Sequence, residues 1–401
     1  MSSEAEALAL DAADPGHREL FDIPPVHEGP YPEVAYFAGN SLGLRPKATR
    51  TELLEDLDSW AALGVEGHLE GERPWLPYHE LLTGPAARLV GALPSETVVM
   101  NSLTVNLHLL MVSFYRPTAA RYRILIEDSA FPSDSYAVQS QARFHGYDDA
   151  VVRVQPSEVL DRLGEDVALV LLGGVNYLTG ELMDIPAITA AGQAAGAVVG
   201  WDLAHAAGNV PLELHEWGVD FAAWCSYKYL NAGPGSLAGA FVHERHLGGD
   251  RPRFEGWWST EAATRFEMAP YSRPPQSADA WQVSNPPIFS MSPVRTSLEI
   301  FDRVGITALR ERSLRLTAYL ETLLDLPIIT PTDPARRGAQ LSLRIGGALT
   351  AGELAKRLRF EYGVIADARE PDVLRLAPVP LYSTYHDCWR AAAALAEVIP
   401  G

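Results

Sequence analysis

Lysine is scarce in this chain, and one lysine has neighbours suited to chemistry. The 401 residues hold 32 lysines and arginines, of which only Lys47, Lys228 and Lys356 are lysines. Lys47 and Lys356 lie in polar stretches typical of solvated helix faces, whereas Lys228 lies among aromatic and apolar residues. A lysine kept in a chain that otherwise uses arginine favours a task that needs a nucleophilic amine.

Asp202 is the natural partner for this amine. It ends an apolar strand predicted at residues 197–201, and Lys228 follows 26 residues later, just beyond a second predicted strand at residues 220–224. Ligands of open α/β sheets bind at the carboxyl ends of the strands, so we expect both side chains to face one crevice. A pyridoxal phosphate enzyme needs this pair, because the amine forms a Schiff base and the carboxylate keeps the ring nitrogen protonated. An Asp that caps a helix beside a partly exposed lysine would give the same pattern.

Further residues could complete such a site. The segment 101–106 follows a short strand and opens a helix, where free N–H groups bind phosphate or the segment serves as a simple cap. Phe131 and Asp134 lie at a strand-to-helix turn, and His205 follows Asp202 by three residues. Arg375 lies inside an apolar strand and needs an anion, either a substrate carboxylate or an internal acid.

The pattern of elements that must position these residues is that of an α/β protein. Apolar strands predicted at 122–127, 167–172, 197–201, 220–224 and 237–243 alternate with helices at 132–143 and 186–196. Such strands favour a mostly parallel sheet covered on both faces. One long helix is expected at 294–324, before a small α+β unit with strands at 340–345 and 373–376 and helices at 350–361 and 384–398. The expected divisions are an N-terminal segment that contributes to the small domain and the active site (1–50), a large cofactor-binding domain (51–295), and the linking helix with the small C-terminal domain (296–401).

Composition narrows the class of protein. The net charge is −19, which predicts repulsion of phosphate backbones and anionic lipids, so we expect neither nucleic acid nor membrane as a partner. Two cysteines, Cys225 and Cys388, exclude a disulfide framework or a cysteine-based metal cluster, and we expect no metal. Neither a signal peptide pattern nor an apolar run of about 18 residues is found, which predicts a cytoplasmic enzyme.

A series of blocks in one order, spread over residues 36–386, resembles kynureninase. They are GNSLG (39–43), GVEGH (64–68), NSLTVNL (101–107), FPSD (131–134), DLAH (202–205), WCSYKYLNAG (224–233), WW (257–258), SNPP (284–287) and LAPVPLY (376–382). The resemblance implies a fold-type I pyridoxal phosphate enzyme with a mostly parallel seven-stranded sheet and a small C-terminal α+β domain. It also implies a homodimer that cleaves kynurenine or 3-hydroxykynurenine to an anthranilate and alanine.

The resemblance assigns roles to individual residues. Lys228 is the Schiff-base lysine, Asp202 the partner of the ring nitrogen, and Tyr227 an aid to proton transfer. The implied cofactor contacts are Leu103, Thr104, Phe131, Asp134, Asp202, His205, Tyr227, Lys228, Trp257 and Asn285. The implied substrate contacts are Ser41, His68, Ser284, Asn285 and Arg375. Trp257 and Asn285 are expected to come from the partner subunit, which would make the dimer obligatory for activity.

Two features bear on how this chain differs from other members. The set His68, Ser284 and Asn285 resembles forms that favour 3-hydroxykynurenine, whereas forms that favour kynurenine carry Trp, Gly and Thr there. At Gly173 the family often has Ser or Thr near the cofactor, so this chain lacks that hydroxyl, and a water or Asn176 would have to replace it.

Other readings of the sequence stay open at this point. Residues 39–43 also match the G-x-S-x-G nucleophile elbow, which would make Ser41 a hydrolase nucleophile. A desulfurase-like lyase would need a reactive thiolate at Cys225 or Cys388. A related enzyme could act on a ring-modified kynurenine, and a degenerate member could serve as a binding protein.

Overall fold

A seven-stranded sheet forms the centre of the protein in the computed structural model, which describes residues 3–26, 30–347 and 349–399. The strand order is β2-β8-β7-β6-β5-β3-β4. The strands are β2 (Thr97–Met100), β3 (Arg123–Glu127), β4 (Val151–Val154), β5 (Val167–Gly173), β6 (Val198–Asp202), β7 (Phe221–Trp224) and β8 (Ala238–Val242). Strands β3 to β7 pair in parallel, and β8 is antiparallel to both β7 and β2. The predicted mostly parallel α/β sheet is therefore confirmed.

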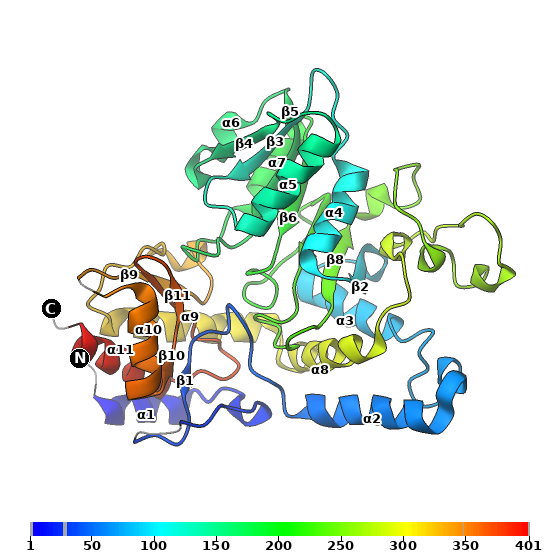
Figure 1. The fold of residues 1–401 in the computed structure, drawn as a ribbon. Coiled ribbons are helices and arrows are strands. Elements are labelled where there is room, and N and C mark those ends of the chain that lie inside the picture. The colour runs from blue at the N-terminus through cyan, green and yellow to red at the C-terminus, as the bar shows by residue number, and fades with distance from the viewer. Residues whose placement is uncertain (1–2, 27–29, 348, 400–401) are drawn as a thin grey trace.

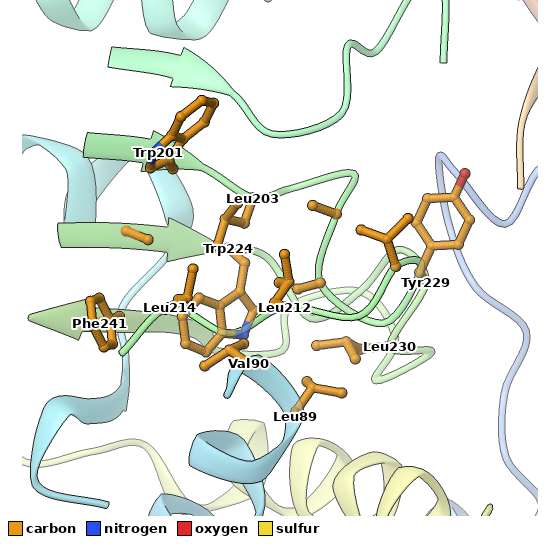
Figure 2. Packing of buried hydrophobic residues seen from close by; sticks show 14 of the residues in the cluster. Leu89, Val90, Trp201, Leu203, Leu212, Leu214, Trp224, Tyr229, Leu230 and Phe241 are labelled. Atoms are coloured by element: carbon orange, nitrogen blue, oxygen red, sulfur yellow. The ribbon is translucent and has the colours of Figure 1, made fainter. Parts of the chain in front are cut away.

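The sheet is buried on both faces, as its apolar strands require. Along β7, Phe221 and Ala223 belong to one core cluster while Ala222 and Trp224 belong to another, because successive side chains of a strand point to opposite faces. One face carries α4 (Leu103–Phe114) and α5 (Pro132–Phe144), and the other carries α3 (Glu80–Val90) and α7 (Ile185–Ala194), with the short α6 (Val159–Arg162) beside α7. Figure 2 shows Trp224 and Phe241 packed from the sheet towards Leu89 and Val90 of α3.

A smaller unit lies beside the large one (Figure 1). Its antiparallel sheet has the order β11-β12-β9, with β9 at Leu341–Arg344, β11 at Asp367–Arg369 and β12 at Val373–Leu376. Helices α10 (Ala351–Tyr362) and α11 (Tyr385–Val398) complete it. The N-terminal segment joins this unit, because α1 (Glu4–Ala13) packs on α11 and β1 (Ala35–Tyr36) pairs in parallel with β10 (Val364–Ile365).

The long helix expected at residues 294–324 is wrong in one respect, because the structure has two helices there. Helix α8 (Ile288–Val304) packs on α2 (Ala48–Leu63) and α3, and α9 (Ile306–Leu323) packs on α11. Gly305 separates them with a φ of 84°, in the left-handed region that a helix interior does not allow. The expected boundary at 295–296 falls inside α8, and the division into domains stays a prediction. Within the described residues, no helix combines the length and apolarity that crossing a bilayer requires.

Candidate active site

Four strand ends converge on one cavity of about 390 Å³, here called the strand-end cavity. Glu127, Gly173 and Asp202 are the last residues of the parallel strands β3, β5 and β6, and Lys228 follows β7 by four residues. All four line this cavity. Parallel strands end at the same edge of a sheet, so the topology alone brings the acid and the amine together.

Lys228 is held by a histidine on one side and faces an aromatic ring on the other. Its Nζ lies 3.0 Å from Nε2 of His205 and 5.9 Å from the centre of the Phe131 ring. Burial and the nearby Lys228, Arg375 and Arg369 hold the pKa of His205 well below its ordinary value. The imidazole is therefore neutral, and in the tautomer with its proton on Nδ1 it accepts a hydrogen bond at Nε2 from the amine of Lys228. That Nδ1 is buried and has no hydrogen-bond partner in the described structure.

Three carboxyl groups form the opposite wall. Oδ1 of Asp202 accepts a hydrogen bond from the backbone N–H of Ala204 at 2.7 Å. Asp134, buried at the start of α5, leaves Oδ1 without a partner among the described atoms, and burial together with Asp202 raises its pKa well above the usual range. Burial also raises the pKa of Glu127 to about 7, although the N–H of Gly173 donates to it at 3.2 Å. The wall thus places Asp202 beside two acids whose pKa values are raised.

The start of α4 forms a third side of the cavity and suits an anion. Asn101, with a φ of 49°, turns the chain into the helix, and Ser102 occupies the cap position without a side-chain capping bond. The hydroxyls of Thr104 and Ser133 lie 2.8 Å apart at the cavity wall. Unpaired N–H groups and the helix dipole at such a terminus attract phosphate.

The loop that carries Ser41 packs directly on the lysine loop. The N–H of Gly43 donates to the carbonyl of Tyr227 at 2.8 Å, and a Cβ at Gly43 would lie 2.4 Å from the carbonyl oxygen of Lys228. This contact explains the second glycine of the G-x-S-x-G match. Ser41 itself lacks the positive φ of a strained nucleophile elbow, since the non-glycine residues of the described chain with positive φ are Asn101, Asn231 and Met268.

Two arginines of the small unit share one acid at the remaining side. Arg375 is fully buried, lies 2.7 Å from Oδ1 of Asp367 and donates to the carbonyl of Tyr177. Arg369 lies 3.3 Å from the same oxygen and lines the cavity. The internal acid left open by the sequence is thus present. Two guanidinium groups facing one carboxylate still leave a surplus positive charge at this corner.

A second hollow of about 450 Å³, here called the outer cavity, holds other expected residues. His68, Trp257 and Asn285 line it together with Val65 and Phe266. Trp257 is 45% exposed, and Ser284 is an exposed neighbour of Asn285.

The expected site residues therefore divide into two groups. The strand-end cavity brings together Ser41, Leu103, Thr104, Phe131, Asp134, Asp202, His205, Tyr227 and Lys228. It does not include His68, Trp257, Ser284, Asn285 or Arg375. It adds residues that the sequence did not single out, among them Glu127, Ser133, Tyr177 and Arg369. Asn176 does not line the cavity, because its side chain binds Ser129 and the turn at 178–179.

The residues of the strand-end cavity fit pyridoxal phosphate. The cavity offers an amine for the aldehyde, a carboxylate for the ring nitrogen, an aromatic face at Phe131 and a helix start for the phosphate. Two buried polar atoms of residues that line the cavity, Oδ1 of Asp134 and Nδ1 of His205, have no hydrogen-bond partner within the described residues. They are therefore available to a ligand.

Neither cysteine is suited to thiolate chemistry. Burial raises the pKa of the Cys225 thiol to about 11 and holds that of the Cys388 thiol well above its ordinary value. At neutral pH both remain thiols, which are poor nucleophiles.

Glu96, His215 and His243 form a group of metal-ligand type at the opposite edge of the sheet, with ligand atoms within 4.8 Å of one another. The carboxylate of Glu96 is already satisfied by Nδ1 of His215 at 3.0 Å and by the N–H groups of Leu93 and Glu244. This hydrogen-bonded group therefore has a structural role, because it connects three segments of the chain.

Solved structures with the same fold are pyridoxal phosphate enzymes or their relatives. A cysteine desulfurase from Thermococcus onnurineus matches with a TM-score of 0.75 at 15% identity, covering 91% of this chain and 94% of that one. The cystine C-S lyase C-DES, in complex with its reaction product cysteine persulfide, matches with a TM-score of 0.77 at 17% identity, covering 91% and 97%. A mutant of that lyase carries glycine covalently linked to its PLP cofactor. At these identities the likeness shows the fold.

Sequence relatives identify the family. Residues 309–395 match the kynureninase C-terminal domain. A kynureninase of Salinispora tropica is 70% identical over 100% of this chain and 98% of its own length. Kynureninases of Myxococcus xanthus and Koribacter versatilis are 54% and 53% identical, covering 98% and 97% of this chain and 96% of each relative. This chain therefore belongs to the kynureninase family of pyridoxal phosphate-dependent enzymes.

Proposed function

We propose that this enzyme hydrolyses the Cβ–Cγ bond of L-kynurenine or 3-hydroxy-L-kynurenine and releases L-alanine with anthranilate or 3-hydroxyanthranilate. Membership of the family supports the reaction. The observation that carries the proposal is the strand-end cavity itself, where Lys228 and Asp202 share a space with a helix start and an arginine corner. A ring-modified kynurenine remains the alternative substrate.

Each wall of the cavity has a task in this reaction. Bound pyridoxal phosphate supplies an electron sink for the carbanion formed at the α-carbon of the substrate. Asp202 holds a proton on the ring nitrogen, and Phe131 covers one face of the site. Lys228 Nζ removes the α-proton, and the neutral His205 at 3.0 Å orients that amine by accepting a hydrogen bond from it. Burial raises the pKa of Tyr227, so its hydroxyl keeps its proton and can donate it.

Arg375 binds the α-carboxylate of the substrate in this proposal. Its Nη2 has an ion-pair distance of 2.7 Å to Asp367 but no well-aligned hydrogen bond, so a donor remains for a ligand. A carboxylate gripped by a guanidinium forms strong charge-assisted hydrogen bonds. Ser41, which lines the cavity beside the lysine loop, supports the same end of the substrate.

We further propose a homodimer in which Trp257 and Asn285 of each subunit complete the partner's site. The outer cavity supports this idea, because exposed apolar side chains cluster around it, and such patches mark interfaces. Val65, Leu69 and Phe266 are between 60% and 74% exposed. His68 and Ser284 lie on or beside the same surface and would approach the substrate from it.

Mixing two inactive variants tests the shared site. Lys228→Ala and Trp257→Ala are each expected to be inactive alone, but a mixed dimer keeps one intact site. Random exchange of subunits should restore about a quarter of the wild-type activity. Absence of any recovery, in a mixture whose exchange is verified by mass tags, would contradict a shared site.

A preference for 3-hydroxykynurenine is the finer part of the proposal. It rests on the resemblance of His68, Ser284 and Asn285 to forms with that preference. Side-by-side kcat/KM on both substrates and on a ring-modified analogue tests it, with the triple exchange His68→Trp, Ser284→Gly and Asn285→Thr as the matched variant. The ratio should move towards kynurenine in the exchange, and an unchanged ratio would refute the assignment.

A further inference from the structure

Glu127 is a buried acid in the strand-end cavity to which the proposed mechanism gives no task. It is 4% exposed and lines the cavity at the end of β3. The backbone N–H of Gly173 donates to it, at 3.2 Å to Oε2 and 3.3 Å to Oε1, and its own backbone N–H adds a second interaction that favours the ionised form. A Cβ at position 173 would lie 3.0 Å from Oε1, so the glycine leaves this carboxyl uncovered towards the cavity.

The charges around Glu127 disfavour its ionised form. Asp128 directly follows Glu127 after the end of β3, Asp202 ends β6, and Asp134 faces the site from α5. The cations that line the cavity, Lys228 and Arg369, have other close partners in His205 and Asp367. Burial and these acids raise the pKa of Glu127 to about 7. A protonated carboxyl has one O–H donor, which it can offer to a ligand in the cavity.

The order of the strands indicates what this donor would face. The start of α4 follows β2 at one edge of the sheet, Asp202 is on β6, and Glu127 is on β3 beyond β5. In pyridoxal phosphate the phosphate arm and the phenolic oxygen flank the aldehyde carbon, opposite the ring nitrogen. A ring with its nitrogen at Asp202 and its phosphate at α4 turns the phenolic oxygen towards β5 and β3.

We propose that Glu127 is a protonated positioning residue that donates a hydrogen bond to the phenolic oxygen of the bound cofactor, through the space that Gly173 leaves open. The bond fixes the ring against in-plane rotation about Asp202. It also makes cofactor binding depend on a proton held by the protein.

Cofactor titration tests this without any turnover. The dissociation constant of pyridoxal phosphate is measured by visible absorbance for the wild type, Glu127→Gln, Glu127→Ala and Asp128→Asn at pH 6, 7 and 8. The amide of Glu127→Gln keeps a donor of the same shape but cannot lose a proton. Asp128→Asn removes an exposed neighbouring carboxylate that disfavours the ionised form of Glu127 but leaves the Glu127 donor in place, so at pH 6 it should bind like the wild type and serves as the matched control.

The expected difference in cofactor affinity between the wild type and Glu127→Gln depends on pH. At pH 6 the wild type and Glu127→Gln should agree within about twofold, and Glu127→Ala should bind roughly tenfold more weakly, the loss of one hydrogen bond. Above pH 7 the wild type should weaken relative to Glu127→Gln by up to about tenfold per pH unit, because the proton must be restored for binding. Because the dissociation constants of the two proteins are compared at the same pH, pH effects that both proteins share cancel in their ratio.

Three outcomes would overturn the proposal. They are a ratio of wild type to Glu127→Gln that stays flat from pH 6 to 8, a Glu127→Gln variant as weak as Glu127→Ala, and an Asp128→Asn variant that binds as weakly as Glu127→Ala at pH 6. Circular dichroism melting of each variant checks the fold. If Glu127→Ala fails to fold, the ratio with Glu127→Gln decides alone.

Discussion

Gly43→Ala should damage the site by displacing the lysine loop, although position 43 makes no contact with a ligand. The added Cβ would lie 2.3 Å from Oδ1 of Asn231, 2.4 Å from the carbonyl oxygen of Lys228 and 2.7 Å from Cα of Asn231. Two of these three atoms belong to the backbone, which cannot rotate away. Ordinary contact begins at 3.4 Å, so the two loops must separate by about 1.0 Å.

The magnitude follows from that displacement. Overpacking of a buried contact costs about 1–3 kcal/mol of folding free energy. A shift of about 1 Å at a catalytic group lowers the rate by about 100-fold. The hydrogen bond from the N–H of Gly43 to the carbonyl of Tyr227 is strained by the same movement. We expect a lower melting temperature, weaker visible absorbance of the bound cofactor and a kcat reduced by about two orders of magnitude.

Gly192→Ala provides the matched control. Its Cβ would meet Cγ2 of Val199 at 2.6 Å, a similar overlap, but on the outer helix α7 and against a side chain. Calorimetry, cofactor titration and kynurenine turnover are measured on both variants. If Gly43→Ala loses stability while keeping wild-type cofactor affinity and kcat, the argument that Gly43 positions Lys228 is wrong.

Four other changes have defined outcomes. Lys228→Ala should abolish the visible absorbance that appears when the wild type takes up pyridoxal phosphate, measured by spectrophotometry. Arg375→Gln should raise KM about 10- to 100-fold, the loss of a charged hydrogen bond, while cofactor absorbance is retained. Cys225→Ala should keep kcat within about twofold, because a buried thiol does no chemistry here. Asp220→Asn should cost about 1.5–3 kcal/mol in urea unfolding, since it removes the charged acceptor that the buried Asp220 offers to the exposed Arg245 and the half-buried His246. The pKa of Asp220 is lowered to about 2 by its hydrogen bonds, so its contribution should be complete above pH 4 and lost as the pH falls towards 2.

The sequence predicted the parts of the fold that depend on local pattern. Apolar runs gave the central strands to within a residue or two at each end, and Asp202 and Lys228 followed from their places after two of those strands. The break at Gly305 was missed because helical periodicity continues on both sides of it. A glycine inside an apolar-periodic stretch does not by itself reveal a left-handed φ.

The missed residues of the site share a physical cause. Glu127 closes a strand whose three central residues are apolar, so its burial depends on β5 and α5 packing around it. Arg369 lies on a strand of only three residues, which is too short to show a period. Arg375 was expected as an anion site, and only the fold showed that Asp367 stands within reach. Contacts between elements that are distant in sequence, or that lie on neighbouring short strands, cannot be read from spacing along the chain.

The corner with Arg369 and Arg375 belongs to the small unit, whereas the amine of Lys228 belongs to the large one, and the chain passes between them at Gly305. An amino acid that binds the arginine corner and the amine of Lys228 at the same time links the small unit to the large one. Part of the binding free energy then serves to hold the two units in one relative position, and a ligand that lacks the carboxylate would not link them. In a thermal unfolding experiment, a bound amino acid of this kind should make the two units unfold together in a single, sharper transition.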